Sequence, residues 1–457
     1  MRRSLMSLLL GCCAGVAAQQ VEYLEPHRVG IEISRDDDDW IAEYSFNRPV
    51  DGWFFPRSSL AREGQIAWRQ RDWTVETPGV KLTRRGHYDV LESERGGMPA
   101  KVRVRFKPFT GDLLDDYAPA VRFTDGGFAL LSAQFDVLPL KALNEADVLP
   151  NDLNNNYFAE THYAMRFDDG EKVFGHDGGF ATYVLFGPTR RVEARDVVTV
   201  FDPQLPAWIH DSLERSVTEL LARYAGQLGP LPEGKPTVMV AWGGPTNGIV
   251  TRSGGALRGQ IVMKYEGDGL LSETPRQRAE GLWFVAHEAA HFWLGQTVGY
   301  DYAREAWITE GGAELLAVRA IAALDPAYDW RNDLDRDIRD CVTFARGHGI
   351  ESARDRNEHR AYYACGAVFA LVAEAAGKSA FHVFVRRLVD ENRGDGIVSR
   401  AEWLGVLDAV SGDSSLSRDI SALLDQGSPD PAPLIAALFD RAGVPYVLDE
   451  QKIPRMK

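Results

Sequence analysis

His-Glu-Ala-Ala-His, at residues 287–291, is the stretch of sequence that decides the fold. Thr274 followed by proline precedes it, which indicates a helix cap and a first helical turn, so we predict a helix that continues to about residue 295. Two histidines four residues apart lie on one helical face, and both imidazoles can therefore reach one metal ion. Glu288 follows the first histidine and can lie beside the metal-bound water, where it would act as general base.

The third predicted ligand is Glu310, which follows His291 after an interval of 18 residues. Two histidines and one carboxylate leave the fourth position of a tetrahedral zinc ion open for water, as catalytic zinc requires. Zinc lowers the pKa of that water towards about 7, which produces a nucleophile near neutral pH. Gly311 and Gly312 follow the ligand and lower helix stability by roughly 1 kcal/mol each, so we expect them to make room for a substrate.

These residues resemble the signature of gluzincin metallopeptidases related to aminopeptidase N, and the glycyl aminopeptidase branch is similar too. Residues 291–295, His-Phe-Trp-Leu-Gly, look like the family's His-x-Trp-Phe-Gly. Residues 307–313, Trp-Ile-Thr-Glu-Gly-Gly-Ala, look like its Trp-Leu-Asn-Glu-Gly-Phe-Ala. The resemblance covers about residues 200–380 and implies a thermolysin-like, mainly helical catalytic domain with one Zn²⁺ ion.

The resemblance also assigns roles to individual residues. It implies that His287, His291 and Glu310 are the zinc ligands and that Glu288 is the general base.

A tyrosine is expected to complete the site. The family places it in Tyr-x-Lys-Gly-Ala, and residues 363–367 here read Tyr-Ala-Cys-Gly-Ala, with Cys365 in place of lysine. The resemblance implies that Tyr363 holds the developing oxyanion, and a phenol suits this role because charge accumulates there only in the transition state. Tyr362 is the competing candidate, and in a third reading both tyrosines are core residues of a helix over 361–376.

The sequence departs from the family where a substrate amine would bind. The family has a Gly-x-Met-Glu-Asn strand whose glutamate binds that amine, and the matching residues 254–259 carry Arg258 in place of the acid. A cation repels an ammonium group, which argues against the usual capture of a peptide N-terminus. Arg258 either contacts a carboxylate or carbonyl of a peptide or is a surface residue on an edge strand. The strand itself can pair with an extended peptide.

The chain divides into regions with different predicted secondary structure. Residues 101–106 alternate between polar and apolar side chains, and Asp-Gly-Gly at 125–127 and 177–179 is typical of hairpin turns. After residue 202, helices are predicted over 206–225 and 361–376, with buried strands at 237–242 and 260–265. We therefore predict an α+β multidomain fold: an N-terminal antiparallel β-sandwich-like domain over 19–201, the catalytic domain over 202–380 and a C-terminal helical tail over 381–457.

Composition limits the class of protein and of partner. The 457 residues are 45% hydrophobic and 26% charged, which is ordinary for a globular protein and excludes a disordered chain or a coiled-coil rod. The formal net charge is −15, which disfavours nucleic acid because such binding needs a basic surface that releases counterions. We expect a peptide or protein substrate as the partner.

The N-terminus predicts export. Two arginines precede an apolar run over residues 5–16 and then Val-Ala-Ala, which is typical of a secretory signal peptide over 1–18 and is too short for a transmembrane span. The alternative is a lipid anchor, because Leu-Leu-Gly-Cys ending at Cys12 resembles a bacterial lipoprotein box. We expect a periplasmic or extracellular protein. Cys341 and Cys365 then either form one disulfide or remain small buried core residues.

These observations predict an exported zinc metallopeptidase that hydrolyses peptide bonds with a metal-activated water and is aminopeptidase-like without the usual amine-binding glutamate. The alternative is a catalytically inactive exported binding protein with a vestigial or structural zinc site. The open coordination position argues against that alternative, because structural zinc sites usually have four protein ligands. Hydrolysis of another type of bond by the same water is a further alternative.

Overall fold

The computed structural model describes residues 26–36, 39–114, 116–140, 161–170, 173–176, 181–231 and 234–457. The predicted signal peptide over 1–18, the lipid attachment site at Cys12 and the turn at 177–179 lie outside the described residues.

The N-terminal part is built from three sheets. The largest has six strands in the order β12-β11-β1-β2-β7-β4, with bounds Val173–His176, Thr161–Asp168, His27–Asp36, Asp39–Phe46, Lys101–Phe106 and Trp73–Val75. A second has the order β10-β3-β6-β5, with bounds Leu138–Pro139, Gly52–Phe54, Tyr88–Ser93 and Val80–Arg85. The third has the order β13-β9-β8, with bounds Tyr183–Phe186, Phe128–Leu131 and Ala120–Arg122.

The burial pattern of β7 agrees with the sequence, whereas the pairing of β1 with β11 differs from the predicted topology. In β7 every second residue is buried, as the alternation at 101–106 predicts. The predicted antiparallel pairing holds for the other described strands of this part but not for β1 and β11, which pair in parallel from His27 opposite Thr161 to Ser34 opposite Asp168. The physical reason is the connection: β11 follows β1 only after a long excursion of the chain, and such a crossover allows parallel pairing where a tight hairpin does not.

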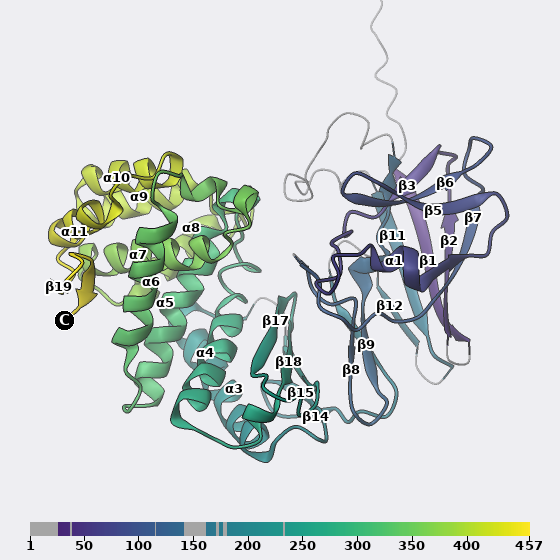
Figure 1. Cartoon of the computed structure of the whole chain (residues 1–457), viewed down its shortest axis with the longest axis horizontal. Helices are drawn as coiled ribbons and strands as arrows, with labels where there is room; N and C mark the ends of the chain where they lie inside the picture. Colours follow the sequence, from purple (N-terminus) through teal and green to yellow (C-terminus); the bar gives the residue numbers. More distant parts are fainter. Residues whose placement is uncertain are drawn as a thin grey trace, which may run out of the picture.

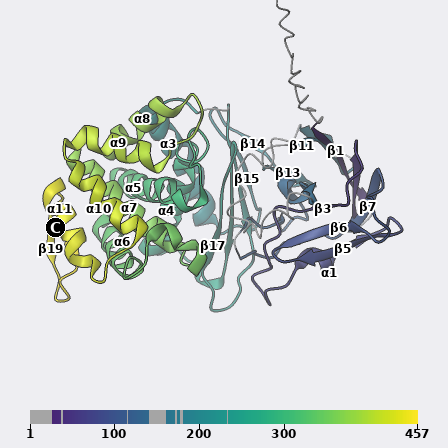
Figure 2. The same cartoon turned by 90° about the horizontal axis from the view of Figure 1, so that it is seen from above.

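A five-stranded sheet lies between the N-terminal strands and the helices (Figures 1 and 2). Its order is β14-β15-β16-β18-β17, with bounds Val192–Glu193, Val198–Phe201, Thr237–Trp242, Gln260–Glu266 and Thr251–Leu257. The strands predicted at 237–242 and 260–265 are therefore confirmed. Since β14 and β15 belong to this sheet, it begins before the domain boundary expected at residues 201 and 202.

The two faces of this sheet have different partners. Val238 and Val240 of β16 face the core that contains the helices, whereas Met239 and Ala241 face a separate cluster shared with β8, β9 and β13. This follows from the alternation of side chains along a strand. The N-terminal part is thus held against one face of the sheet by apolar packing.

Helices form the remainder of the chain (Figure 1). The short α1 (Trp68–Asp72) lies in the N-terminal part, and the other α-helices of the described residues are α3 (Ala207–Leu228), α4 (Pro275–Ala290), α5 (Trp307–Leu324), α6 (Trp330–Phe344), α7 (Arg360–Ala376), α8 (Phe381–Asn392), α9 (Arg400–Ser411), α10 (Ser414–Asp425) and α11 (Pro431–Ala442). The helices predicted at 206–225 and 361–376 correspond to α3 and α7. One hydrophobic core includes residues from α3 to α11, so the C-terminal helices pack on the helices of the predicted catalytic domain.

Two further contacts hold the C-terminal part in place. A disulfide between Cys341 and Cys365 joins α6 to α7, which decides between the two alternatives for these cysteines. The chain ends in a hairpin of β19 (Tyr446–Leu448) and β20 (Pro454–Met456), and the backbone N–H of Met456 donates to Asp335 Oδ1 of α6 at 2.7 Å.

No single helix among the described residues has the length and hydropathy of a membrane span. Only α7 and α8 taken together, which meet at 99°, satisfy that criterion by length and composition.

Candidate active site

Helix α4 carries His287 and ends directly before His291, which caps it. The Thr274 hydroxyl accepts the backbone N–H of Gln277 at 3.2 Å and caps the N-terminus. The helix ends at Ala290, so the prediction that it continues to about residue 295 is wrong. Residues after Ala290 form tight turns, and Gly295 has φ +141°, a conformation that glycine adopts readily and that turns the chain away.

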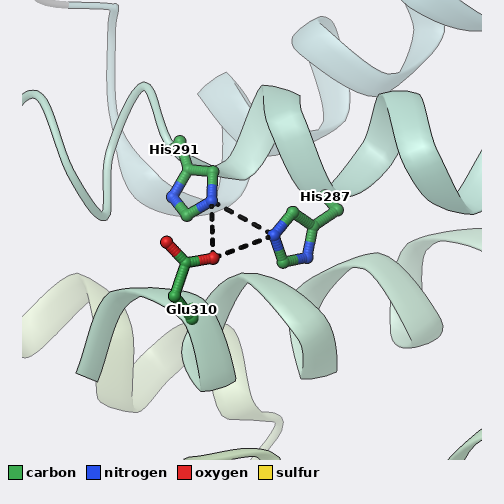
Figure 3. Close-up of side chains that lie close together, drawn as sticks. All are labelled: His287, His291 and Glu310. Atoms are coloured by element: carbon green, nitrogen blue, oxygen red, sulfur yellow. Dashed lines mark hydrogen bonds and ion pairs between the residues drawn. The ribbon is translucent and has the colours of Figure 1, made fainter. Parts of the chain in front are cut away.

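The three predicted ligands converge from two helices (Figure 3). His287 Nε2 lies 3.1 Å from His291 Nε2 and 3.3 Å from Glu310 Oε2, and His291 Nε2 lies 3.4 Å from the same oxygen. Glu310 comes from the first turn of α5. These atoms belong to one of two groups among the described residues whose donor atoms are close enough to share an ion; the other is the more exposed set of His210, Asp211 and Glu214.

The donor set fits a zinc ion. His291 Nδ1 lies 2.8 Å from the carbonyl of Leu294, and a hydrogen bond there places the ring proton on Nδ1 and leaves the Nε2 lone pair directed at the cluster. His287 Nδ1 lies 3.5 Å from Glu314 Oε2, which favours the same arrangement. Two nitrogen lone pairs and a carboxylate oxygen then face one another. These electron-rich atoms repel one another unless a cation lies between them.

Electrostatics at the site also favour a cation. Burial alone would lower the pKa of His287, but Glu310 and Glu314 outweigh it and raise that pKa to about 10. The pKa of His291 is raised in the same way, mainly by Glu310. Burial would raise the pKa of Glu310, yet the two histidines hold it well below its usual range. The negative potential that attracts protons here attracts a metal ion equally well.

Glu314 lies one turn after Glu310 and is fully buried. Apart from the ion pair with His287, neither of its side-chain oxygens has a hydrogen-bond partner among the described residues. Such an acid fixes the ring orientation of a metal-binding histidine.

Glu288 lines a cavity of about 430 Å³ together with His291 and Glu310. The residue is 8% exposed, and its carboxylate accepts a hydrogen bond from the backbone of Ala256 in β17. Burial raises the pKa of Glu288 above its ordinary value, while His287 and His291 partly oppose that shift. The residue is therefore close to the three ligands and is a better proton acceptor than an exposed glutamate.

The structure separates the two candidate tyrosines. Tyr363 lines the cavity, its ring stacks on that of His287 with centroids 5.4 Å apart, and its hydroxyl bonds to Glu310. The negative charge of Glu310, together with burial, raises the pKa of Tyr363 well above 10, so its hydroxyl stays protonated. Tyr362 is buried and donates to the carbonyl of Glu351 at 3.2 Å.

The expectation that Gly311 and Gly312 make room for a substrate is wrong. A Cβ at Gly311 would lie 2.1 Å from the carbonyl carbon of Gly366 in α7, and a Cβ at Gly312 would lie 2.5 Å from Leu294. Gly311 and Gly366 thus face each other where α5 and α7 cross. The room is filled by α7, and the close crossing brings Tyr363 to the metal ligands.

Tyr117, from the N-terminal part, also reaches the site. It lines the cavity, and its hydroxyl donates to the carbonyl of Ala256 at 2.9 Å. Gly255 permits this contact, because a Cβ there would lie 2.4 Å from the tyrosine ring. Sequence reasoning missed Tyr117, since the residue lies in no local motif and is far along the chain from the histidines.

Arg258 lies away from the ligands. It is exposed in the turn between β17 and β18 and is not among the described residues that line the cavity.

On the edge strand β17, the outward peptide groups of Ala256 already bond to Tyr117 and Glu288. Peptide groups alternate in direction along a strand, so those of Gly254 are the next to face outward.

Comparisons with known proteins place the fold. No family model matches the chain, and no curated protein matches it. Among solved structures, an aminopeptidase N family protein from Idiomarina loihiensis has a TM-score of 0.61 at 11% identity, covering 89% of this chain and 78% of that chain. Native yeast LTA4 hydrolase has a TM-score of 0.56 at 10% identity, covering 91% and 70%.

A further solved structure is an M1 zinc metallopeptidase from Deinococcus radiodurans, bound to a Tyr-Ser-Ala substrate. It has a TM-score of 0.51 at 15% identity and covers 88% of this chain and 93% of that chain. At these identities the likeness is one of fold. The resemblance seen in the sequence is therefore confirmed at the level of the M1 metallopeptidase fold.

Proposed function

We propose that this protein is a zinc-dependent peptidase whose active site consists of His287, His291, Glu310, Glu288 and Tyr363. The observation that carries the proposal is the convergence of three donor atoms within 3.4 Å of one another beside a buried carboxylate. The shared fold with M1 zinc metallopeptidases supports it.

His287, His291 and Glu310 would hold one Zn²⁺ ion, with Glu314 fixing the His287 ring. When bound, zinc supplies a Lewis acid that polarises a carbonyl and lowers the pKa of a water molecule towards neutrality. Three protein ligands leave room for such chemistry, whereas a structural site is closed by a fourth.

Glu288 would move the protons of the reaction. Its carboxylate lines the cavity beside the ligands, and its raised pKa lies closer to the operating pH than that of an exposed glutamate. We assign it two steps: it accepts a proton from the attacking water and then gives that proton to the leaving amine. Both steps need one group that reaches either side of the scissile bond.

Tyr363 would stabilise the oxyanion. The hydroxyl is protonated and lines the same cavity, so it can donate to an oxygen on which negative charge develops. Its stacking on His287 restricts the ring, so the hydroxyl is held beside the metal ligands, where it would exchange its hydrogen bond to Glu310 for one to the oxyanion.

The edge of β17 would hold the peptide. Gly254 lines the cavity and presents the next outward peptide groups of the strand, which can pair with an extended substrate. The side chains that line this cavity include no carboxylate beyond Glu288 and Glu310 among the described residues. Recognition of a free amine by an acid therefore has no evident residue here, and we do not assign an aminopeptidase specificity.

Glu288→Gln tests the proposal. The variant should retain one equivalent of zinc and lose peptide hydrolysis by about 10²–10⁴-fold, because the amide cannot accept the proton. Glu273→Gln, just before the same helix, is the control, since Glu273 pairs with Arg278 at the surface. Metal analysis and cleavage of an unbiased peptide library give the readouts. Hydrolysis by zinc-loaded Glu288→Gln at the wild-type rate would refute the assignment.

The competing candidate is a non-catalytic binding protein with the same zinc site. One observation favours it: the outward peptide groups of Ala256 are already bonded to Tyr117 and Glu288, so less of the β17 edge is available to pair with a substrate. A zinc-loaded wild-type protein that binds peptides from the library without cleaving any of them would establish this candidate.

We further propose that the protein is exported, either in free form or attached through a lipid on Cys12. The Cys341–Cys365 disulfide supports this, because disulfides persist in oxidising compartments. Mass spectrometry of the mature N-terminus would test it: cleavage after residue 18 supports free export, a lipid on Cys12 supports the alternative, and an intact Met1 contradicts both.

A further inference from the structure

A second, larger cavity of about 1260 Å³ adjoins the candidate active site. Tyr117, Gly254, Tyr300 and Tyr363 line both cavities, so the two are continuous through these residues. Its walls come from the N-terminal part on one side and from β17 and β18 on the other. A peptide that reaches the metal ligands from this direction must pass through it.

The charge of this cavity is opposite in sign to that of the protein. The cationic side chains that line it are Arg57, Arg62, Arg122, Arg252, Lys264 and Arg354. The only described carboxylates in its lining are Asp112 and Asp116. In a chain of formal charge −15, such a concentration of cations favours negatively charged groups inside the cavity.

Three of these six cations already have a carboxylate partner. Arg57 is paired with Asp116, Arg252 lies 2.9 Å from Glu280, and Lys264 lies 3.0 Å from Glu266. Arg62, Arg122 and Arg354 form no ion pair with a carboxylate in the described part of the chain, but Arg62 and Arg122 are exposed whereas Arg354 is half-buried. The Nε of Arg354 is buried and has no hydrogen-bond partner there either. A partly buried guanidinium without a partner carries a desolvation cost that a carboxylate ligand would relieve.

Arg354 is also close enough to the catalytic groups to act on a substrate there. It lies in a 3₁₀ turn (Arg354–Arg356) shortly before α7, the helix that carries Tyr363. Tyr300 lines both cavities, so it borders the larger one, which Arg354 also lines, and the smaller one, which Glu310 lines. A ligand bound to Arg354 is therefore adjacent to the reacting centre.

We propose that Arg354 is a specificity-determining residue that binds a carboxylate of the substrate, so that the site acts on peptides carrying an acidic group near the scissile bond. This inference rests on the proposed peptidase function and names its substrate class. The carboxylate belongs either to an Asp or Glu side chain or to the C-terminus of a short peptide. In both cases guanidinium and carboxylate form charge-assisted, bidentate hydrogen bonds.

Matched peptides test the proposal on the full, zinc-loaded chain. A peptide cleaved by the wild type is made with Glu, Gln or Lys at each position near the scissile bond, and with a free or amidated C-terminus. We expect about tenfold higher kcat/KM for one carboxylate-bearing member than for its neutral counterpart, mostly through KM. The Glu–Gln comparison identifies a side-chain carboxylate, and the acid–amide comparison identifies a terminal one.

Arg354→Gln should bring that ratio to about one. Arg356→Gln is the control: it removes the same charge from the same turn, but Arg356 pairs with Glu358 and does not line the cavity. Its ratio should stay near the wild-type value. Equal cleavage of all members by the wild type, a preference for Lys, or a ratio that persists in Arg354→Gln would each overturn the proposal.

A binding measurement separates this inference from the proposed function. Calorimetry with zinc-loaded Glu288→Gln and the same peptides needs no turnover. If no peptide is cleaved by the wild type, the peptidase assignment fails. The carboxylate site would still be supported if Glu288→Gln binds carboxylate peptides about tenfold more tightly than neutral ones and if adding Arg354→Gln removes this difference. Equal affinity for acidic and neutral peptides would refute it.

Discussion

At the scale of single residues, the site is a set of buried charges that hold one another in place. Glu314 contacts no solvent and lies next to His287 Nδ1, on the side of the ring opposite the other ligands. Its role is therefore to orient a ligand, and the negative charge it adds strengthens the attraction of the site for a cation.

Glu314→Gln should lower zinc affinity by about 10–100-fold, because the amide keeps the shape of the side chain and loses its charge. Competition with a chelator of known affinity measures the effect. Glu391→Gln, an exposed acid of α8 paired with Arg387, is the control and should bind zinc like the wild type. Unchanged affinity in Glu314→Gln would show that the acid has no influence on the metal.

Residues within one local pattern could be predicted from the sequence, and residues brought together by tertiary contacts could not. His287 and His291 share one helical face by spacing alone, and Glu310 follows at a distance typical of a known motif. Tyr117 and Arg354 belong to a loop and a short turn without periodicity, so nothing in the sequence connects them with the histidines. Their positions depend on how the sheets pack.

At the scale of elements, the crossing of α5 and α7 determines where Tyr363 lies. Two glycines, Gly311 and Gly366, face each other at this crossing, and the backbones approach more closely than any other residue would allow. The sequence analysis identified Gly311 as unusual but assigned it the wrong role, because a missing side chain in a helix is compatible with a ligand or with a second helix.

Gly311→Ala should destabilise the protein by about 3 kcal/mol, because its methyl group would overlap the backbone of Gly366. Peptide hydrolysis should also fall, since α7 must move and Tyr363 moves with it. Gly405→Ala in α9 is the matched control: no atom lies within 4 Å of the added methyl group, so a small gain of about 1 kcal/mol is expected. Urea unfolding measures both. Equal stability of Gly311→Ala and wild type would contradict the proposed close approach.

The disulfide restrains the same helix from its other side. Cys341 and Cys365 are 24 residues apart, and a loop of that length is expected to contribute about 3–4 kcal/mol by restricting the unfolded chain. Reduction should lower the free energy of unfolding by this amount, as measured in urea with and without reductant. The Cys341→Ala, Cys365→Ala double variant should be insensitive to the reductant. A wild type that is equally insensitive would indicate that the bond contributes nothing.

At the scale of the whole molecule, the N-terminal part has its own buried charge. Asp136 lies in its core, is 7% exposed, and has one oxygen without a hydrogen-bond partner among the described residues. Burial raises its pKa to about 7, and Arg57 only partly opposes the shift. The folded state therefore binds a proton more tightly than the unfolded chain, for which the ordinary value of 3.8 applies.

The stability of the protein should consequently depend on pH through this residue. The contribution of protonated Asp136 is complete below about pH 4 and is lost as the pH rises through about 7, a change of up to about 4 kcal/mol. Asp136→Asn should remove that dependence and be more stable than the wild type at pH 8. Urea unfolding between pH 4 and 8 measures it, with exposed Asp211→Asn as control. A pH profile that Asp136→Asn leaves unaltered would contradict this account.

The contact between Tyr117 and Gly255 has a consequence for how such proteins diverge. The two positions occupy one shared volume, although Tyr117 belongs to a loop of the N-terminal part and Gly255 to β17 of the five-stranded sheet. A larger residue at position 255 is compatible with this packing only if position 117 becomes smaller. Among homologues these two sites are thus expected to covary, and a chimera that joins halves from different lineages should be inactive unless both sites come from the same parent.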